Sequence, residues 1–167
     1  YLLKTEPFDL NVVWNKLFKS ELFNGTVLVR FPKGRVQEDN FTIFRLFLNA
    51  NTIVTVNEPL YYYVQRAGSI MANFTRRFMI DTIESHMYMS DYLMNHCSSV
   101  KNELQLYLLN SYVELSRRVC ANKCKKEYND LLTQYKHYVL AHTVDTSHNP
   151  LWKCKQYIKR VLVKLYY

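Results

Sequence analysis

The sequence predicts a helix-rich α+β protein, with a small mixed part at residues 1–73 and a helical extension at residues 74–167. Three observations support this fold class. Turn-forming residues are scarce, with 3 Gly and 4 Pro among 167 residues, which favours long helices. Short β-branched runs bounded by turn signals occur only before residue 74. Beyond that point, apolar residues recur at helical spacing.

The first elements are short. Residues 8–18 (FDLNVVWNKLF) are apolar and β-branched enough for a short strand or extended segment. Residues 19–23 (KSELF) read as one helical turn. Asn24-Gly25 and Pro32-Lys33-Gly34 are turn signals that separate these pieces from the next helix.

A helix is predicted from Glu38 to Ala50, because Phe41, Phe44 and Leu48 follow helical spacing. Acidic Glu38 and Asp39 stand at its start, where they complement the positive end of the helix dipole.

Two strands are expected next. Residues 52–57 (TIVTVN) form the best strand candidate, and residues 60–66 (LYYYVQR) form a second one after Pro59. Tyr61, Tyr63 and Gln65 would share one face of the second strand.

Helical periodicity then runs through residues 75–95, 98–121, 125–142 and 151–166, with a capping and turn cluster at residues 143–150. These stretches predict a C-terminal helical bundle.

The net charge of +8 suggests an anionic partner, such as a phosphate-bearing substrate, nucleic acid or a membrane surface. No apolar run approaches the ~20 residues that span a bilayer, and no signal peptide is evident, so we expect a reduced, cytoplasmic protein. Cys120 and Cys124 lack a second pair at zinc-site spacing, so we expect no metal site within this chain.

Four groups of residues could carry chemistry. The acidic pair Glu38-Asp39 could hold a general base, or it could only cap a helix. Tyr63, Arg66 and Ser69 could bind phosphate through a guanidinium and a turn, or lie in a surface hairpin.

The third group, Trp14-Asn15-Lys16, offers an apolar ring face beside polar groups, as a sugar platform does; the alternative is a core indole with solvated neighbours. The fourth group is a basic amphipathic stretch at residues 152–166, suited to an anionic membrane surface or to docking on the bundle.

Taken together, residues 14–71 resemble the C-terminal, acceptor-side part of bacterial family 2 glycosyltransferases. The resemblance is carried by four blocks in order: WNKLFK with ELF (14–23), FPKG (31–34), Glu38-Asp39, and PLYYY through Arg66 to Ser69-Ile70 (59–70). It implies part of a GT-A catalytic domain, a nucleotide-sugar donor, a glycan or lipid-linked acceptor, and a divalent metal (Mg or Mn) in the full-length enzyme.

The resemblance also assigns roles to residues. It implies that Asp39, with Glu38 as its neighbour, is the catalytic base of inverting, hexosyltransferase-like transfer in cell-surface polysaccharide synthesis. It places Trp14, Asn15 and Lys16 on the acceptor side. The block from Tyr63 resembles the segment that closes over the donor diphosphate, which would place Arg66 and Ser69 near phosphate.

The sequence departs from the family pattern in one respect. The nucleotide-binding strands and the metal-binding Asp-x-Asp of the family precede the Trp-Asn-Lys block, and only 13 residues precede Trp14 here. We therefore expect a fragment that is inactive alone. The competing interpretation is a basic helical module that binds nucleic acid, a partner protein or a membrane surface. Nucleic-acid binding is the weaker of these, because acidic residues interrupt the basic ones and the sequence has no known DNA- or RNA-recognition motif.

Overall fold

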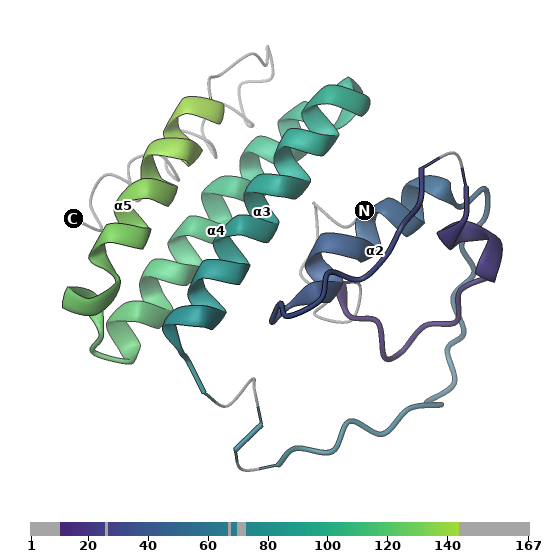
Figure 1. Ribbon diagram of the computed structural model, residues 1–167, viewed down its shortest axis with the longest axis horizontal. Coiled ribbons are helices and arrows are strands. Elements are labelled where there is room, and N and C mark those ends of the chain that lie inside the picture. Colours follow the sequence, from purple (N-terminus) through teal and green to yellow (C-terminus); the bar gives the residue numbers. More distant parts are fainter. Residues whose placement is uncertain (1–10, 26, 67, 70–72, 144–167) are drawn as a thin grey trace. The chain divides into compact units, whose positions relative to one another are not determined.

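The structure is a computed structural model that describes residues 11–25, 27–66, 68–69 and 73–143 (Figure 1). The chain divides into two compact units, one formed mainly by residues 4–89 and the other by residues 90–167. The division falls within one helix, between Met89 and Ser90. The domain boundary at residues 73/74, drawn from composition, stays a prediction.

The first unit is organised around α2 (Glu38–Asn49), which follows a short 3-10 helix, η1 (Ser20–Phe23). Val29, Ile43 and Leu46 form its buried cluster, and five partly buried side chains pack against them: Val13, Phe18, Leu22, Phe23 and Phe47. The apolar face of α2 therefore holds the irregular N-terminal segments in place. The predicted helical turn at 19–23 and the helix at 38–50 are confirmed.

Side-chain hydrogen bonds to main-chain oxygens reinforce this packing. Arg45 of α2 donates to the oxygen of Leu28 at 2.9 Å, and Asn49 donates to the oxygen of Leu22 at 2.9 Å. Arg30 donates to the oxygen of Phe23 at 2.9 Å. These bonds tie main-chain carbonyl groups of the N-terminal segments to side chains of α2 and of Arg30.

The predicted strands are wrong. Residues 11–18, 52–57 and 60–66 are irregular or extended, and the described part of the chain contains no strand. The predicted α+β class, with a strand-and-helix half of a GT-A domain, is therefore not what the structure shows; its described residues form a helical protein. A strand is stabilised by a ladder of hydrogen bonds to a neighbour, and the β-branched composition of these segments does not supply that neighbour.

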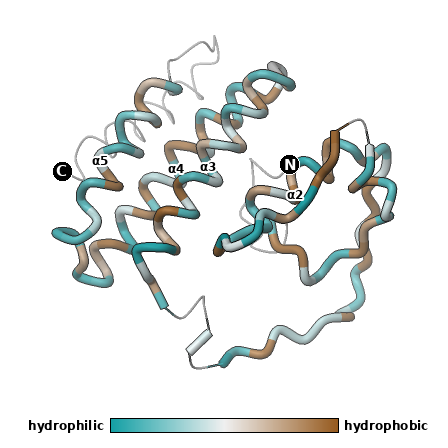
Figure 2. Tube along the Cα trace, viewed as in Figure 1, coloured by the Kyte–Doolittle hydropathy of each residue, from teal (hydrophilic) through white to brown (hydrophobic). Residues whose placement is uncertain are grey.

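Residues 52–66, called the extended segment below, carry many apolar side chains although they are exposed. Figure 2 shows hydrophobic residues along it, and Val54 is 79% exposed, Leu60 75% and Tyr62 91%. Strand propensity reports how well a side chain fits a half-buried pleated surface. The sequence pattern is present here, but the buried surface is not.

The helices predicted within the described part of the chain after residue 74 are confirmed. The helix α3 (Arg76–His96) begins where Thr75 Oγ1 accepts a hydrogen bond from the Phe78 amide, the usual N-terminal cap. It matches the stretch predicted at 75–95. Phe78 and Met79 are buried in its first turn.

In the second unit, α4 (Lys101–Ala121) follows the 3-10 turn η3 (Ser98–Val100), and α5 (Lys125–His142) lies beside α4 (Figure 1). A Schellman turn joins these two helices, because the Cys124 amide donates to the oxygen of Val119 and the Lys123 amide donates to that of Cys120. Lys123 adopts the left-handed conformation (φ 55°) that this motif needs. Both helices confirm the predicted stretches.

Buried tyrosines join α4 and α5. Tyr112 and Tyr135 are fully buried with ring centroids 6.1 Å apart, and the Tyr135 hydroxyl is hydrogen-bonded to that of Ser111. The Tyr138 hydroxyl also donates to Asp91 near the end of α3 at 2.6 Å. Part of the Tyr-rich composition is therefore structural. The helix predicted at 151–166 lies outside the described residues.

Candidate functional site

The acidic pair Glu38-Asp39 occupies the first turn of α2, as predicted. The residue before it, Gln37, has left-handed backbone angles (φ 65°, ψ 35°) that turn the chain sharply into the helix. The Gln37 side-chain oxygen accepts a hydrogen bond from the Asn40 side chain at 2.7 Å. The start of the helix is thus held locally, and both carboxylates lie at its positive end.

Asp39 is half-buried, and burial raises its pKa above the ordinary value, with the charge of Glu38 adding to the rise. The main-chain N–H of Asn40 donates to Asp39 Oδ1 at 3.0 Å and opposes this shift. Lys16 also acts to lower the pKa through its charge. The fold therefore brings Lys16 into electrostatic reach of Asp39, two predicted site residues that lie 23 positions apart.

Lys16 is partly buried and well anchored. Its ammonium group donates to the main-chain oxygen of Val12 at 2.7 Å and to Asn15 Oδ1 at 2.6 Å. These contacts hold the Trp-Asn-Lys block as a compact turn whose cation acts on Asp39.

Trp14 forms an aromatic stack with the extended segment. Its ring centroid lies 4.6 Å from that of Tyr61 and 4.9 Å from that of Tyr63, with interplanar angles of 26° and 21°. Tyr61 and Tyr63 remain 49% and 40% exposed. Alternation along extended chain places the two tyrosines on the same side, as the strand hypothesis required, although no strand forms.

Arg66 and Ser69 lie in one turn of the first unit. The Ser69 amide donates to the main-chain oxygen of Arg66 at 3.3 Å, and the Asn73 side chain donates to the oxygen of Ser69 at 3.3 Å. Arg66 is exposed. The structure joins these two predicted residues to each other through this turn.

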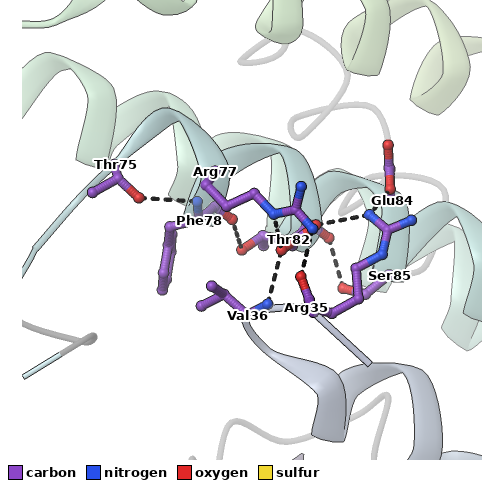
Figure 3. A network of polar contacts seen from close by, with 10 residues as sticks. Arg35, Val36, Thr75, Arg77, Phe78, Thr82, Glu84 and Ser85 are labelled. Atoms are coloured by element: carbon purple, nitrogen blue, oxygen red, sulfur yellow. Dashed lines mark hydrogen bonds and ion pairs between the residues drawn. The ribbon is translucent and has the colours of Figure 1, made fainter. Parts of the chain in front are cut away.

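A polar network that the sequence did not predict joins the segment before α2 to α3 (Figure 3). Asp81 of α3 is fully buried and accepts hydrogen bonds from Arg35 Nη1 at 2.7 Å, from the Val36 amide at 2.8 Å and from Arg77 Nε at 2.8 Å. Arg35 also pairs with Glu84, and Arg77 donates to the main-chain oxygen of Gly34 at 2.6 Å. We call Arg35, Arg77, Asp81 and Glu84 the clamp.

The buried carboxylate of Asp81 has hydrogen-bond donors that stabilise its charged form. Burial by itself raises the pKa of Asp81, but the hydrogen bonds from Arg35, the Val36 amide and Arg77 outweigh it, so that the pKa falls below the ordinary value. One signal in the sequence pointed to this network. Asp81 stands among the apolar positions of a predicted helix, and a carboxylate on a buried face requires partners.

Two findings bear on metals and membranes. Within the described ranges, no three His, Cys, Asp or Glu side chains gather closely enough to hold a metal ion. Of the helices in the described part, none combines the length and apolar character needed to cross a bilayer.

The first unit thus offers a carboxylate with a raised pKa at Asp39 and an aromatic stack at Trp14. Asp39 is a carboxylate with a raised pKa, and a general base works best when its pKa approaches the working pH. Trp14 and its two tyrosines offer the apolar ring faces on which sugars stack.

Comparison with curated proteins shows two partial similarities. The chain is 48% identical over 56 residues to glycosyltransferase GlyG of Streptococcus pneumoniae serotype 4 (strain ATCC BAA-334 / TIGR4), covering 34% of this chain and 18% of that protein. It is 27% identical over 102 residues to glycosyltransferase GlyA of the same strain, covering 61% of this chain and 14% of that protein.

No protein-family profile matches the chain, and no solved structure matches it. The aligned regions span less than a fifth of the length of the two curated relatives. Over parts of its length, the chain is similar to curated glycosyltransferases.

Proposed function

We propose that this chain is the acceptor-side part of an inverting family 2 glycosyltransferase, which moves a sugar from a nucleotide-sugar donor to a saccharide or lipid-linked acceptor in cell-surface polysaccharide synthesis. Similarity to GlyG and GlyA supports the transferase class. The observation that carries the proposal is the half-buried Asp39, whose pKa is raised and on which the charge of Lys16 acts.

In the proposed reaction, Asp39 accepts the proton of the acceptor hydroxyl. The acceptor oxygen then forms a bond to the anomeric carbon of the donor sugar, while the bond from that carbon to the diphosphate oxygen breaks. The nucleoside diphosphate leaves with the bonding electron pair, and the anomeric configuration is inverted. A general base of this kind accelerates transfer by about 10²–10⁴-fold.

The neighbouring charges adjust the base in opposite directions. The negative charge of Glu38 raises the pKa of Asp39 and strengthens it as a base, whereas Lys16 favours its ionised form. We assign Glu38 and Lys16 this adjusting role.

The other predicted residues would bind substrate. Trp14 would stack on the acceptor sugar, with Asn15 hydrogen-bonded to a hydroxyl group, and Tyr63 would belong to the segment that closes over the donor diphosphate. Arg66 is exposed in a turn with Ser69, an arrangement that suits a diphosphate oxygen.

The donor site and the divalent metal would be supplied by a part of the longer protein outside this chain. The short coverage of GlyG and GlyA supports this division. We further propose a cytoplasmic location at the inner face of the membrane, with the basic stretch at residues 152–166 as a peripheral contact.

The proposal is tested by measuring sugar transfer with a panel of nucleotide-sugars. The full-length protein that contains this chain should transfer sugar, and the isolated chain should not. Asp39→Asn in the full-length protein should abolish transfer and leave nucleotide binding intact. Robust transfer by the isolated chain, or full activity of Asp39→Asn, would overturn the proposal.

A further inference from the structure

The segment that leads into the acidic pair is tied to a distant helix. Gly34, Arg35 and Val36 each contact α3: the oxygen of Gly34 accepts from Arg77, the Arg35 side chain donates to Asp81, and the Val36 amide donates to Asp81. Figure 3 shows Arg35 and Val36 beside the helix that carries Arg77. Because the Val36 main-chain amide takes part in the network, the contacts fix the backbone of this segment as well as its side chains.

The backbone of this segment requires such support. Gly34 (φ 71°) and Gln37 (φ 65°) both adopt left-handed angles, and Gln37 has a Cβ that makes this conformation unfavourable. An unfavourable residue persists when its surroundings determine its conformation. Gln37 lies between Val36, which the clamp holds, and Glu38, where α2 begins.

Ring contacts attach the start of α2 to the same helix. The guanidinium carbon of Arg35 lies 5.4 Å from the ring centroid of Phe41. Phe41 and Phe44 each have ring centroids 5.9 Å from that of Tyr88 on α3. The acidic pair is therefore fixed on both sides, by the clamp before it and by the aromatic contacts after it.

We propose that Asp81 is a positioning residue, which through Val36 and Arg35 fixes the acidic pair in the orientation that proton abstraction needs. This inference rests on the proposed function of Asp39. It assigns a role in the reaction to a buried carboxylate that lies on another helix and touches no substrate.

The experiment compares three variants in the full-length protein that contains this chain. Asp81→Asn removes the negative charge with which Arg35 and Arg77 form ion pairs. Arg35→Met removes one donor and leaves Asp81 its contacts with the Val36 amide and Arg77, which keeps the proposal testable if Asp81→Asn fails to fold. Glu84→Gln is the matched control, because Glu84 is the more exposed partner of Arg35 Nη1 (Glu84 side chain 47% exposed) and the substitution leaves every hydrogen bond to Asp81 in place.

The rate of hydrogen exchange at the Val36 and Asn40 amides measures directly how firmly this segment is held. Asp81→Asn and Arg35→Met should speed exchange at both amides at least tenfold, and Glu84→Gln should change it less than twofold. Unchanged exchange in Arg35→Met would overturn the proposal. This readout needs no transfer activity, so it decides the positioning even if Asp39→Asn proves active and the proposed function fails.

Kinetics separate positioning from general instability. Asp81→Asn and Arg35→Met should lower kcat at least tenfold, with the KM for the nucleotide-sugar within twofold of wild type. Release of the segment should hydrate Asp39, so the acidic limb of the pH–rate profile should move to lower pH. An unchanged profile with full kcat, or an equal loss in Glu84→Gln, would overturn the proposal.

Discussion

The carboxylate of Asp81 accepts a hydrogen bond from the main-chain amide of Val36 at 2.8 Å, across 45 residues of sequence. Because Val36 lies three positions before Asp39, this one bond connects the interior of α3 to the start of the helix that carries the proposed base. The candidate site is thus shaped by a residue outside the blocks that carry the resemblance. The base, the aromatic platform and two buried titratable groups can each be tested.

The proposed base gives the first prediction. Asp39→Asn in the full-length protein should reduce kcat by about 10²–10⁴-fold, because the amide cannot accept the acceptor proton. Nucleotide binding, measured by calorimetry, should stay within twofold. Glu38→Gln is the comparison: removing its negative charge lowers the pKa of Asp39, so the acidic limb of the rate profile should move to lower pH while transfer persists. Equal losses in both variants would assign the pair a structural role.

The aromatic stack gives the second prediction. Trp14→Ala removes the indole against which Tyr61 and Tyr63 lie, so the acceptor KM should rise about tenfold, in keeping with the ~0.5–1.5 kcal/mol of each aromatic pair. Tyr62→Ala is the matched control, since Tyr62 lies between the two stacked tyrosines and is 91% exposed. It should leave the acceptor KM unchanged. A similar rise in both variants would show that the stack has no special part in binding.

The third prediction concerns the stability of the clamp. Asp81→Asn should reduce the free energy of unfolding by roughly 3–5 kcal/mol at pH 7, as expected when a buried ion pair loses one charge. The folded-state pKa of Asp81 lies below its ordinary 3.8, so its stabilisation is present above that value and is lost as the pH falls through the folded-state pKa. Urea unfolding at pH 7 and pH 3 should therefore show a smaller difference between wild type and variant at pH 3. A pH-independent difference would contradict this account.

His86 gives the fourth prediction. Burial lowers its pKa from 6.5 to about 4, so the folded protein keeps the imidazole neutral. Its contribution to stability is present above pH 6.5 and is lost as the pH falls towards 4, by up to about 3 kcal/mol. His86→Gln should flatten the pH dependence of unfolding over this range, whereas His137→Gln, at an exposed position of α5, should not. Equal effects of the two substitutions would exclude burial as the cause.

Local patterns predicted much of the fold and some of the site. The helices at 38–49, 76–96, 101–121 and 125–142 follow from apolar spacing, because one buried face suffices to define each of them. The strands failed for the opposite reason, since a strand needs hydrogen bonds from a neighbour that its own residues do not encode. The structure stacks Trp14 on Tyr63 and lets the charge of Lys16 act on Asp39, two pairings that the sequence analysis did not predict. Their roles, and those of Arg66 and Ser69, stay predictions.

By itself the sequence determined where helices start and end, which carboxylates stand at the first turn of α2, and the resemblance to glycosyltransferases. These features depend on residues within a few positions of each other. Only the tertiary structure decided that Asp81 is buried with Arg35 and Arg77, and that its carboxylate holds the Val36 amide. The physical reason is that a buried charge is stable only with partners in the right geometry, and those partners come from a distant segment whose position folding alone sets.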